Sequence, residues 1–352
     1  MQHIKNIKIN NFRGITQLEL VNLKPITILV GENSMGKSTI LESMFMITGP
    51  NNPFISMRAT SMRVHGAILP GDMDYIFHDT DYSIHPCIEA EFTGNCHRRL
   101  RLVPLFDMSA TNSAQLLQTG SNTRQMISGL TCMFDIERQD TTYSGNASLA
   151  FGLEGKFVPQ FDNSYQEQIE SVMISPEYGR NNTMEEYDNL VKMGKKENLL
   201  QALCYFDARI NTIESTRDGL FIGYRHLRNL VPLSMAGDGI RKYLRIALQA
   251  FNPECDIIFI DEIENGLHFT AHSKLWECII TSVADGGKQF IITTHNKETL
   301  SCLASKVKNN PEIHSLINVI TLAAGGDDDI APYYLSGQGL YGAITDDVEF
   351  RQ

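Results

Sequence analysis

The sequence lacks the features of a secreted, fibrous or membrane-spanning protein. Its seven cysteines are scattered and never spaced as CxxC, which is typical of free thiols in a reducing compartment. No stretch approaches the ~18 consecutive apolar residues of a membrane helix, and the N-terminus alternates polar and apolar residues where a signal peptide is continuously apolar. Glycine and proline, 26 and 12 of 352 residues, are too few for a collagen-like chain. These absences predict a soluble, cytoplasmic globular protein.

Positive charge is also scarce. The 30 lysines and arginines face 41 aspartates and glutamates, so the net charge is −11. General binding to polyanions is therefore unfavourable, and any contact with nucleic acid requires a local basic patch. We interpret the densest basic groups as a solvated face or a contact for an acidic partner, with direct DNA binding as the alternative. These groups are Arg98, Arg99, Arg101, Lys192, Lys195 and Lys196.

Hydrophobic periodicity predicts strands and helices of an α/β fold in both the N-terminal and the C-terminal part of the chain. Residues 4–9 and 15–20 alternate around a turn, which predicts a hairpin. Residues 26–30 are continuously apolar, as a buried parallel strand is, and a glycine-containing loop and a helical pattern follow. After Pro232 helices and strands alternate again, which predicts a mostly parallel sheet. The strands expected there are residues 256–262, 289–295 and 317–322.

The middle of the chain has a different pattern. Segments such as 87–92, 98–103 and 130–137 alternate like antiparallel strands with one solvated face. Residues 184–216 have apolar side chains at three- and four-residue steps, which predicts helix, and Gly194 is expected to split or cap it. We therefore expect an inserted lobe of strands and short helices rather than a long coiled coil.

A phosphate-binding loop is the strongest motif. GENSMGKS at residues 31–38 matches GxxxxGK[ST] in full and lies between a predicted strand and a predicted helix, as the motif requires. Backbone N–H groups at such a helix N-terminus cradle phosphates, while Lys37 reaches the β- and γ-phosphates and Ser38 ligates Mg²⁺. The loop therefore predicts binding of a nucleoside triphosphate with Mg²⁺. The expected nucleotide contacts are Gly31, Asn33, Ser34, Gly36, Lys37, Ser38 and Thr39.

Two other predicted strands end in polar residues. The apolar run before Asp261 and Glu262 indicates a buried strand, and neighbouring side chains at its end point in different directions. Asp261 is expected to hold Mg²⁺ through water, and Glu262 is expected to orient or deprotonate the attacking water. His295 follows the next strand, at the edge where open parallel sheets bind ligands, and could contact the γ-phosphate.

A second small-residue loop precedes a later helix. LSMAGDG at residues 233–239 places Ser234 before a helix that contains Arg241, Lys242 and Arg245. Such a loop makes a second anion cradle. The phosphate loop and this second loop can bind the same nucleotide only if they come from two chains that face each other.

These motifs together resemble those of ABC-class ATPases of the SMC, RecF and OLD type, most closely the compact AAA-type ATPases of bacterial anti-phage systems such as PARIS, Septu and retron-linked defence. The resemblance covers about the first 50 residues and about residues 230–300, and the middle of the chain matches only loosely. It rests on NFRG at 11–14, GENSMGKST at 31–39, LSMAGDGIRK at 233–242, FIDEIENGLH at 259–268 and TTH at 293–295.

The resemblance implies an ABC-type P-loop ATPase head: a mixed, mostly parallel sheet with flanking helices, an antiparallel N-terminal β part and an inserted α+β lobe. The expected segments are 1–50 and 230–352 for the two parts of the core and 51–229 for the lobe. It also implies an ATP-dependent head-to-head dimer or higher oligomer. In that dimer Ser234, Gly237 and Gly239 of one copy close on the nucleotide held by Lys37 and Ser38 of the other.

The resemblance also assigns roles at the nucleotide. Arg13 would approach it from the opening hairpin, Glu262 would be the catalytic carboxylate, and His295 would be the switch histidine, while residues 264–268 would form the loop that meets the partner subunit. One departure is that the second loop reads SMAGDG where ordinary ABC proteins have SGGQ, which leaves its geometry and turnover open. No glutamine can be assigned to the metal-coordinating loop. Gln125, Gln139 and Gln166 are the candidates.

Several alternatives compete with this interpretation. His268 and His272 have the i, i+4 spacing of two zinc ligands on a helix, but a loop that enters a helix explains them better. Residues 296–352 are too few for the nuclease domain of OLD-type relatives, so any cleavage is expected from another polypeptide. Our preferred hypothesis is an ATPase that scaffolds and regulates a separate effector, a nuclease or toxin, in anti-phage defence. A DNA-repair ATPase of RecF type and a non-hydrolysing interaction module are the alternatives.

Overall fold

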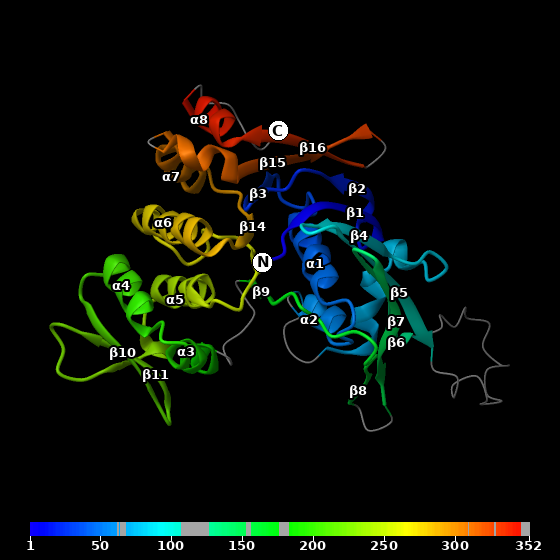
Figure 1. The fold of residues 1–352 in the computed structure, drawn as a ribbon, viewed down its shortest axis with the longest axis horizontal. Coiled ribbons are helices and arrows are strands. Elements are labelled where there is room, and N and C mark those ends of the chain that lie inside the picture. The colour runs from blue at the N-terminus through cyan, green and yellow to red at the C-terminus, as the bar shows by residue number, and fades with distance from the viewer. Residues whose placement is uncertain are drawn as a thin grey trace, which may run out of the picture.

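A computed structural model describes residues 1–61, 63, 68–106, 127–152, 156–175, 183–308, 310–326 and 329–345. The strands of this part of the chain form three sheets: a mostly parallel central sheet, an antiparallel sheet, and a small sheet in a lobe at the opposite end of the molecule from the antiparallel sheet (Figure 1). The predicted mixed α/β class is confirmed. None of the described helices is long and apolar enough to cross a membrane.

The central sheet has the strand order β16-β15-β3-β14-β13-β9, and its pairs are parallel except for β15 with β16. Its strands are β3 (Ile26–Gly31), β9 (Ser171–Ile174), β13 (Ile257–Ile260), β14 (Gln289–Thr293), β15 (Ile317–Ala324) and β16 (Ile330–Ser336). The predicted strands at 26–30, 256–262, 289–295 and 317–322 are therefore confirmed. Neither β9 nor β16 was predicted, because β9 is only four residues long and β16 has no buried residue that would mark it as a core strand.

Both faces of the central sheet are covered by helices, which explains the continuous apolar runs of its strands. On β13, Ile257 and Phe259 face α1 (Lys37–Thr48), whereas Ile258 and Ile260 pack with the helices of the other face. Phe259 meets Phe45 of α1 edge to face, with ring centroids 5.9 Å apart. The helices of the other face are α5 (Asp238–Phe251), α6 (Phe269–Gly286) and α7 (Lys297–Lys308), which Figure 1 shows as a stack.

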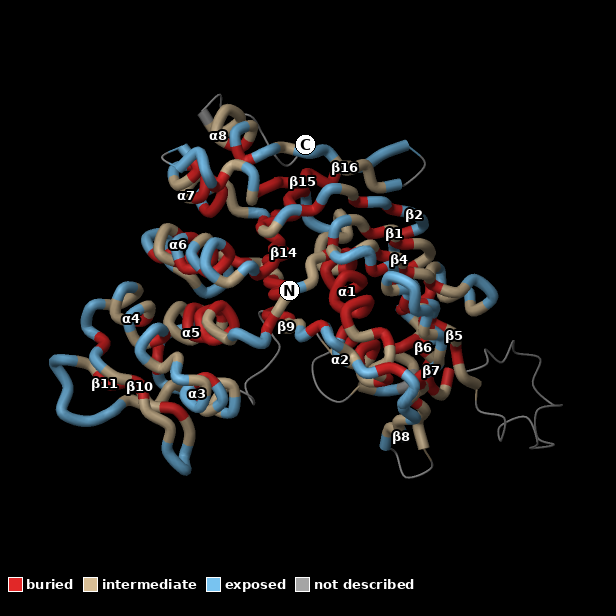
Figure 2. The backbone as a smooth tube through the Cα atoms, viewed as in Figure 1, coloured by how far each residue is buried: buried red, intermediate tan, exposed pale blue. Residues whose placement is uncertain are grey.

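The antiparallel sheet lies on the far side of α1. Its order is β2-β1-β4-β5-β6-β7-β8, and α1 contacts its strands β1, β4 and β5 as well as the central sheet. Helix α1 is therefore almost wholly buried, as its red tube in Figure 2 shows. The predicted hairpin is β1 (Ile4–Phe12) with β2 (Ile15–Leu20). The other strands are β4 (Cys87–Phe92), β5 (Cys96–Phe106), β6 (Ile127–Arg138), β7 (Thr141–Phe151) and β8 (Phe157–Gln160).

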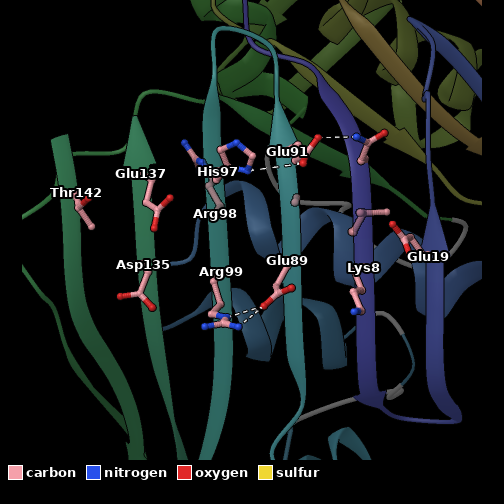
Figure 3. A pocket seen from close by; sticks show the side chains of 13 residues that line it. Lys8, Glu19, Glu89, Glu91, His97, Arg98, Arg99, Asp135, Glu137 and Thr142 are labelled. Atoms are coloured by element: carbon pink, nitrogen blue, oxygen red, sulfur yellow. Dashed lines mark hydrogen bonds and ion pairs between the residues drawn. The ribbon is translucent and has the colours of Figure 1, made fainter. Parts of the chain in front are cut away.

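Successive side chains of β5 point to opposite faces of the sheet, so the arginines predicted to form one basic group lie in two different environments. The Arg98 side chain is 1% exposed and pairs with Glu167 at 2.8 Å, so its assignment to a basic surface was wrong. Arg99 points to the opposite face, where it pairs with Glu89 among the charged side chains that Figure 3 shows. A strand turns successive side chains to opposite faces, so adjacent arginines cannot form one surface patch.

The small lobe, which is not the whole of the lobe expected at residues 51–229, contains two helices and a sheet. They are α3 (Thr183–Lys192), α4 (Lys196–Phe206) and the sheet β10-β11-β12 (Ile210–Thr216, Gly219–Tyr224 and Val231–Pro232). Gly194 separates the two helices with a φ of +72°, as expected. The prediction of helix up to residue 216 was wrong, because Ile210–Thr216 is a strand. This strand contains the β-branched residues Ile210, Thr212 and Ile213, which favour strands. It pairs with β11, and a periodic pattern in the sequence cannot reveal such a partner strand.

The remaining described elements are short. They are α2 (Ile55–Ser61), α8 (Gly337–Thr345) and the 3₁₀ segments Pro70–Ile76, His78–Thr80, Leu233–Met235 and Pro311–Leu316. The boundaries of the segments 1–50, 51–229 and 230–352 stay a prediction. The structure adds that strands from the first and second of these segments share the antiparallel sheet, and that β9 carries the second segment into the central sheet.

Candidate nucleotide-binding site

A cleft of about 580 Å³ lies at the carboxyl ends of β3, β13 and β14. It is lined by the phosphate loop, by the polar residues that follow β13 and β14, and by the turn between β1 and β2. Most predicted site residues therefore meet at one place, as expected for an open parallel sheet. The predicted residues that line it are Arg13, Asn33, Ser34, Gly36, Lys37, Ser38, Thr39, Asp261, Glu262 and His295.

The backbone of the phosphate loop needs its glycines. Gly31 has a φ of +146°, and a Cβ there would lie 2.5 Å from the carbonyl oxygen of Leu322 on β15. Gly36, the residue before α1, has a φ of +72°. The Lys37 ammonium donates hydrogen bonds to the carbonyl oxygens of Gly31 and Glu32, at 2.9 and 2.7 Å. Burial lowers the pKa of Lys37, and the carboxylates of Asp261, Glu264 and Glu262 oppose that shift.

Asp261 joins the phosphate loop to β14. Its Oδ1 accepts hydrogen bonds from the hydroxyls of Ser38, at 3.1 Å, and Thr293, at 2.5 Å. A hydroxyl and a carboxylate that meet beside a phosphate loop are the oxygen ligands that Mg²⁺ prefers. The described residues contain no group of three or more His, Cys, Asp or Glu side chains that could hold a metal alone. The donor set therefore fits a cation shared with substrate phosphates.

Glu262 has a left-handed backbone, with a φ of +48°, which costs energy for a residue with a side chain. Its N–H donates to the Thr293 hydroxyl at 2.8 Å, and its carbonyl oxygen accepts a short hydrogen bond from the Lys242 ammonium of α5. Burial lowers the pKa of Lys242 to about 8, although Glu264, Glu262 and Asp261 favour its charged form. The sequence placed Lys242 only in the helix after the second loop, because its contact with the Glu262 carbonyl forms only when folding brings α5 to this loop.

Arg13 belongs to a buried charge cluster at the edge of the cleft. Its Nε donates to Glu42 of α1 at 2.8 Å, and the two side chains are 8% and 1% exposed. Arg63, which was not predicted, also lines the cleft and donates to Glu42 at 2.7 Å and to the Thr39 hydroxyl at 2.8 Å. The Arg13 Nη2 is buried without a hydrogen-bond partner among the described residues. One carboxylate thus holds two guanidinium groups beside the phosphate loop.

Glu42→Gln is expected to lower the free energy of unfolding by about 3–5 kcal/mol, because an amide leaves the buried Arg13 cation uncompensated. Urea denaturation measures this change. Glu32→Gln, at an exposed glutamate of the phosphate loop, is the matched control and is expected to change stability by less than about 0.5 kcal/mol. Equal stabilities of the two variants would contradict a structural role for the cluster.

Glu264 and His295 contact each other closely. The Glu264 Oε1 accepts the backbone N–H of His295 at 3.0 Å and lies 2.9 Å from its Nδ1, while Oε2 accepts the Thr294 hydroxyl at 2.8 Å. The other two histidines considered as zinc ligands contact separate hydroxyls: His268 meets Thr270 at 3.0 Å and the buried His272 meets Thr299 at 3.1 Å.

The second loop does not line this cleft. Ser234 lines a separate hollow of about 920 Å³ with Arg241, Lys242 and Gly266. Ser234 and Gly237 are exposed, and Met235 between them is 78% exposed. Gly239 lies where a Cβ would be 3.2 Å from the carbonyl oxygen of Gly266, so the start of α5 packs closely on the loop of residues 264–268.

The glutamine candidates stay unassigned. Gln139 lies in the turn between β6 and β7, and Gln166 is exposed before β9; neither lines the cleft. Gln125 lies outside the described residues.

The sheet order and the cleft define an ABC-class P-loop ATPase head, and comparisons with known proteins agree. Residues 124–301, half of the chain, match the family described as "AAA domain, putative AbiEii toxin, Type IV TA system". The protein belongs to this family. Residues 3–84 also match the family described as "AAA ATPase domain".

Individual relatives are distant. A Helicobacter pylori protein named "ATP/GTP phosphatase" is 24% identical over 337 residues, which cover 88% of this chain and 90% of the relative. A "DNA replication and repair protein RecF" from Anaeromyxobacter is 32% identical over 72 residues, 20% of this chain and 19% of the relative. The fold is similar to the Smc head domain with an extended coiled coil, bound to the C-terminal domain of ScpA, from Pyrococcus furiosus. That likeness has a TM-score of 0.52 at 9% identity and covers 99% of this chain and 100% of the other.

Proposed function

We propose that the protein binds ATP with Mg²⁺ in the 580 Å³ cleft, hydrolyses it, and dimerises head to head around the nucleotide. The observation that carries this proposal is the hydrogen-bonded junction of Ser38, Asp261 and Thr293, which joins the phosphate loop to two strand ends. The family match and the name of the Helicobacter pylori relative support ATP hydrolysis.

Each residue of the cleft has a proposed role in binding. The loop from Gly31 to Thr39 presents backbone N–H groups at the start of α1, where the helix dipole favours phosphate. Lys37 exchanges its carbonyl contacts for the β- and γ-phosphates, and Arg13 adds positive charge at the edge of the cleft. Ser38 and Asp261 would hold Mg²⁺, which would supply positive charge beside the phosphate oxygens.

Hydrolysis needs a water aligned with the γ-phosphate. Glu262 follows Asp261 directly, so its carboxylate can orient and deprotonate that water while Asp261 serves the metal. His295 lines the same cleft from the end of β14. As an imidazolium, with a proton on each ring nitrogen, it would donate from Nε2 to the γ-phosphate. Both residues line the cleft, and β13 and β14, the strands that precede them, are neighbours in the sheet.

The second loop is proposed to act on the partner's nucleotide. Ser234, Gly237 and Gly239 lie outside the chain's own cleft. The exposed Met235 lies within this loop, and the exposed Phe269 directly follows the loop of residues 264–268. A second copy would bring these loops to the triphosphate held by Lys37 and Ser38. Because the γ-phosphate would contact both copies, hydrolysis would release the dimer.

We further propose that the dimer, or a higher oligomer built from it, scaffolds and regulates a separate nuclease or toxin in anti-phage defence. The matched family is described as a putative toxin of a type IV toxin–antitoxin system, which supports a role in a system of that kind; the separate effector is our proposal. Purification of the native complex with and without ATP, followed by mass determination, tests the partner. An ATP-dependent mass that contains this chain alone would contradict the scaffold role.

A RecF-like ATPase that binds DNA directly is the second candidate, and the partial match to RecF favours it. Phosphate release that rises on addition of duplex ends or gaps would support this candidate over the effector scaffold. The burial of Arg98 and the pairing of Arg99 with Glu89 remove part of the basic surface that the sequence offered to DNA.

Complementation in trans tests the shared site. Lys37→Ala and Ser234→Arg are each expected to be inactive alone, because one fails to bind ATP and the other blocks the partner's nucleotide. Mixing them is expected to restore phosphate release, since a mixed dimer contains one site with both native halves. Full activity of Ser234→Arg alone would place the complete site within a single chain.

A further inference from the structure

Glu264 and Glu262 are two residues apart but face different partners. The Glu264 side chain is 9% exposed and turns toward the end of β14, whereas the Glu262 Oε2 accepts a hydrogen bond from Asn265 at 3.4 Å. Between them, Ile263 is fully buried in the core and donates its N–H to the Thr293 carbonyl at 3.1 Å. The buried Ile263 therefore anchors the chain so that Glu264 points inward.

The contacts of Glu264 constrain the His295 imidazole. A carboxylate can only accept hydrogen bonds, so the 2.9 Å contact with Oε1 places a proton on the His295 Nδ1. The backbone N–H of His295 and the Thr294 hydroxyl hold the same carboxylate in place. Nε2 is then the ring nitrogen left for the cleft, which His295 lines with a side chain 48% exposed. It accepts a hydrogen bond in the neutral ring and donates one in the imidazolium, whose charge the Glu264 carboxylate stabilises.

The same carboxylate connects His295 to the loop of residues 264–268. The Glu264 carbonyl accepts the N–H of Leu267 at 3.0 Å, and Gly266 packs against Asp238 at the start of α5. The Glu264 backbone thus takes part in a tight turn, while its side chain contacts His295. A shift of this loop would move the carboxylate and with it the imidazole.

We infer that Glu264 is a positioning residue for His295: it fixes the ring orientation and tautomer, and it couples the ring to the loop of residues 264–268. The inference rests on the proposed hydrolysis, because His295 acts there on the γ-phosphate. It assigns Glu264 no contact with nucleotide, metal or water, in contrast to Glu262.

The first measurement is the ¹⁵N spectrum of the histidine rings in the full chain. His295→Ala identifies the His295 signal among the ten histidines. The native protein is expected to show a ring protonated at Nδ1. Glu264→Gln, whose amide can donate as well as accept, is expected to give a mixture of tautomers. The same pure tautomer in both proteins would overturn the inference, whether or not the protein hydrolyses ATP.

The second measurement is a double-mutant cycle on phosphate release. Glu264→Ala is expected to lower kcat by about 10–100-fold with an ATP Kd within about twofold, as the loss of a residue that orients a functional histidine does. Glu264→Gln is expected to lose less, because its oxygen can still accept the ring N–H. In a His295→Ala background Glu264→Ala is expected to have no further effect.

Equal losses in both backgrounds would show that Glu264 does not act through His295. Glu298→Ala, at an exposed carboxylate in the first turn of α7, is the matched control and is expected to leave kcat unchanged. If His295→Ala hydrolyses ATP like the native protein, the proposed role of His295 fails, while the tautomer measurement still decides whether Glu264 sets the ring.

Discussion

Lys37→Ala is expected to weaken ATP binding by about 10²-fold or more, which removes binding at micromolar nucleotide. Loss of one partner of a desolvated charge pair costs about 2–5 kcal/mol, and each 1.4 kcal/mol is a factor of ten. Lys37 has a second effect, because its ammonium links the carbonyl oxygens of Gly31 and Glu32 and thereby closes the phosphate loop. Isothermal titration calorimetry with ATP measures both effects together.

The partial burial of Lys37 contributes to this loss. Burial already lowers its pKa, so the protein holds the ammonium at an energetic cost that a phosphate would offset. Lys24→Ala, at an exposed lysine before β3, is the matched control and is expected to bind ATP normally. Unchanged affinity of Lys37→Ala would mean that the nucleotide binds elsewhere.

Local patterns were sufficient to predict the core of this fold. β3, β13, β14 and most of β15 are buried and mainly apolar because both sheet faces are covered, and a strand that ends in a polar residue indicates the functional edge directly. The strand at Ile210–Thr216 was misassigned because its apolar spacing continues that of α4, and only its pairing with β11 distinguishes it. Periodicity cannot show a partner strand.

Long-range partners were beyond prediction for a different reason. Glu42 lies inside α1 with no motif around it, and its importance comes from Arg13 and Arg63 on other elements. Lys242 was seen only as one cation of a basic helix, although its ammonium contacts the carbonyl of Glu262. Glu264 was placed in a partner-facing loop, and its contact with His295 depends on how that loop turns. Such contacts are set by tertiary packing.

Glu262→Gln is expected to separate binding from hydrolysis. The substitution keeps the size of the side chain, and the amide oxygen can still accept the Asn265 hydrogen bond that Glu262 accepts at 3.4 Å. It removes the negative charge that would draw a proton from the attacking water. General-base contributions are typically 10²–10⁴-fold, so kcat should fall by about 10²-fold or more while the ATP Kd stays within about threefold.

A nucleotide that binds but is not hydrolysed should also hold two copies together. Glu262→Gln with ATP is therefore expected to elute on size-exclusion chromatography at the mass of a dimer or larger, whereas Lys37→Ala should not respond to ATP. Glu254→Gln, at an exposed glutamate before β13, is the matched control and should hydrolyse ATP like the native chain. Native turnover by Glu262→Gln would remove this carboxylate from the chemistry. Slow turnover without a change in mass would instead retain Glu262 and reject the dimer.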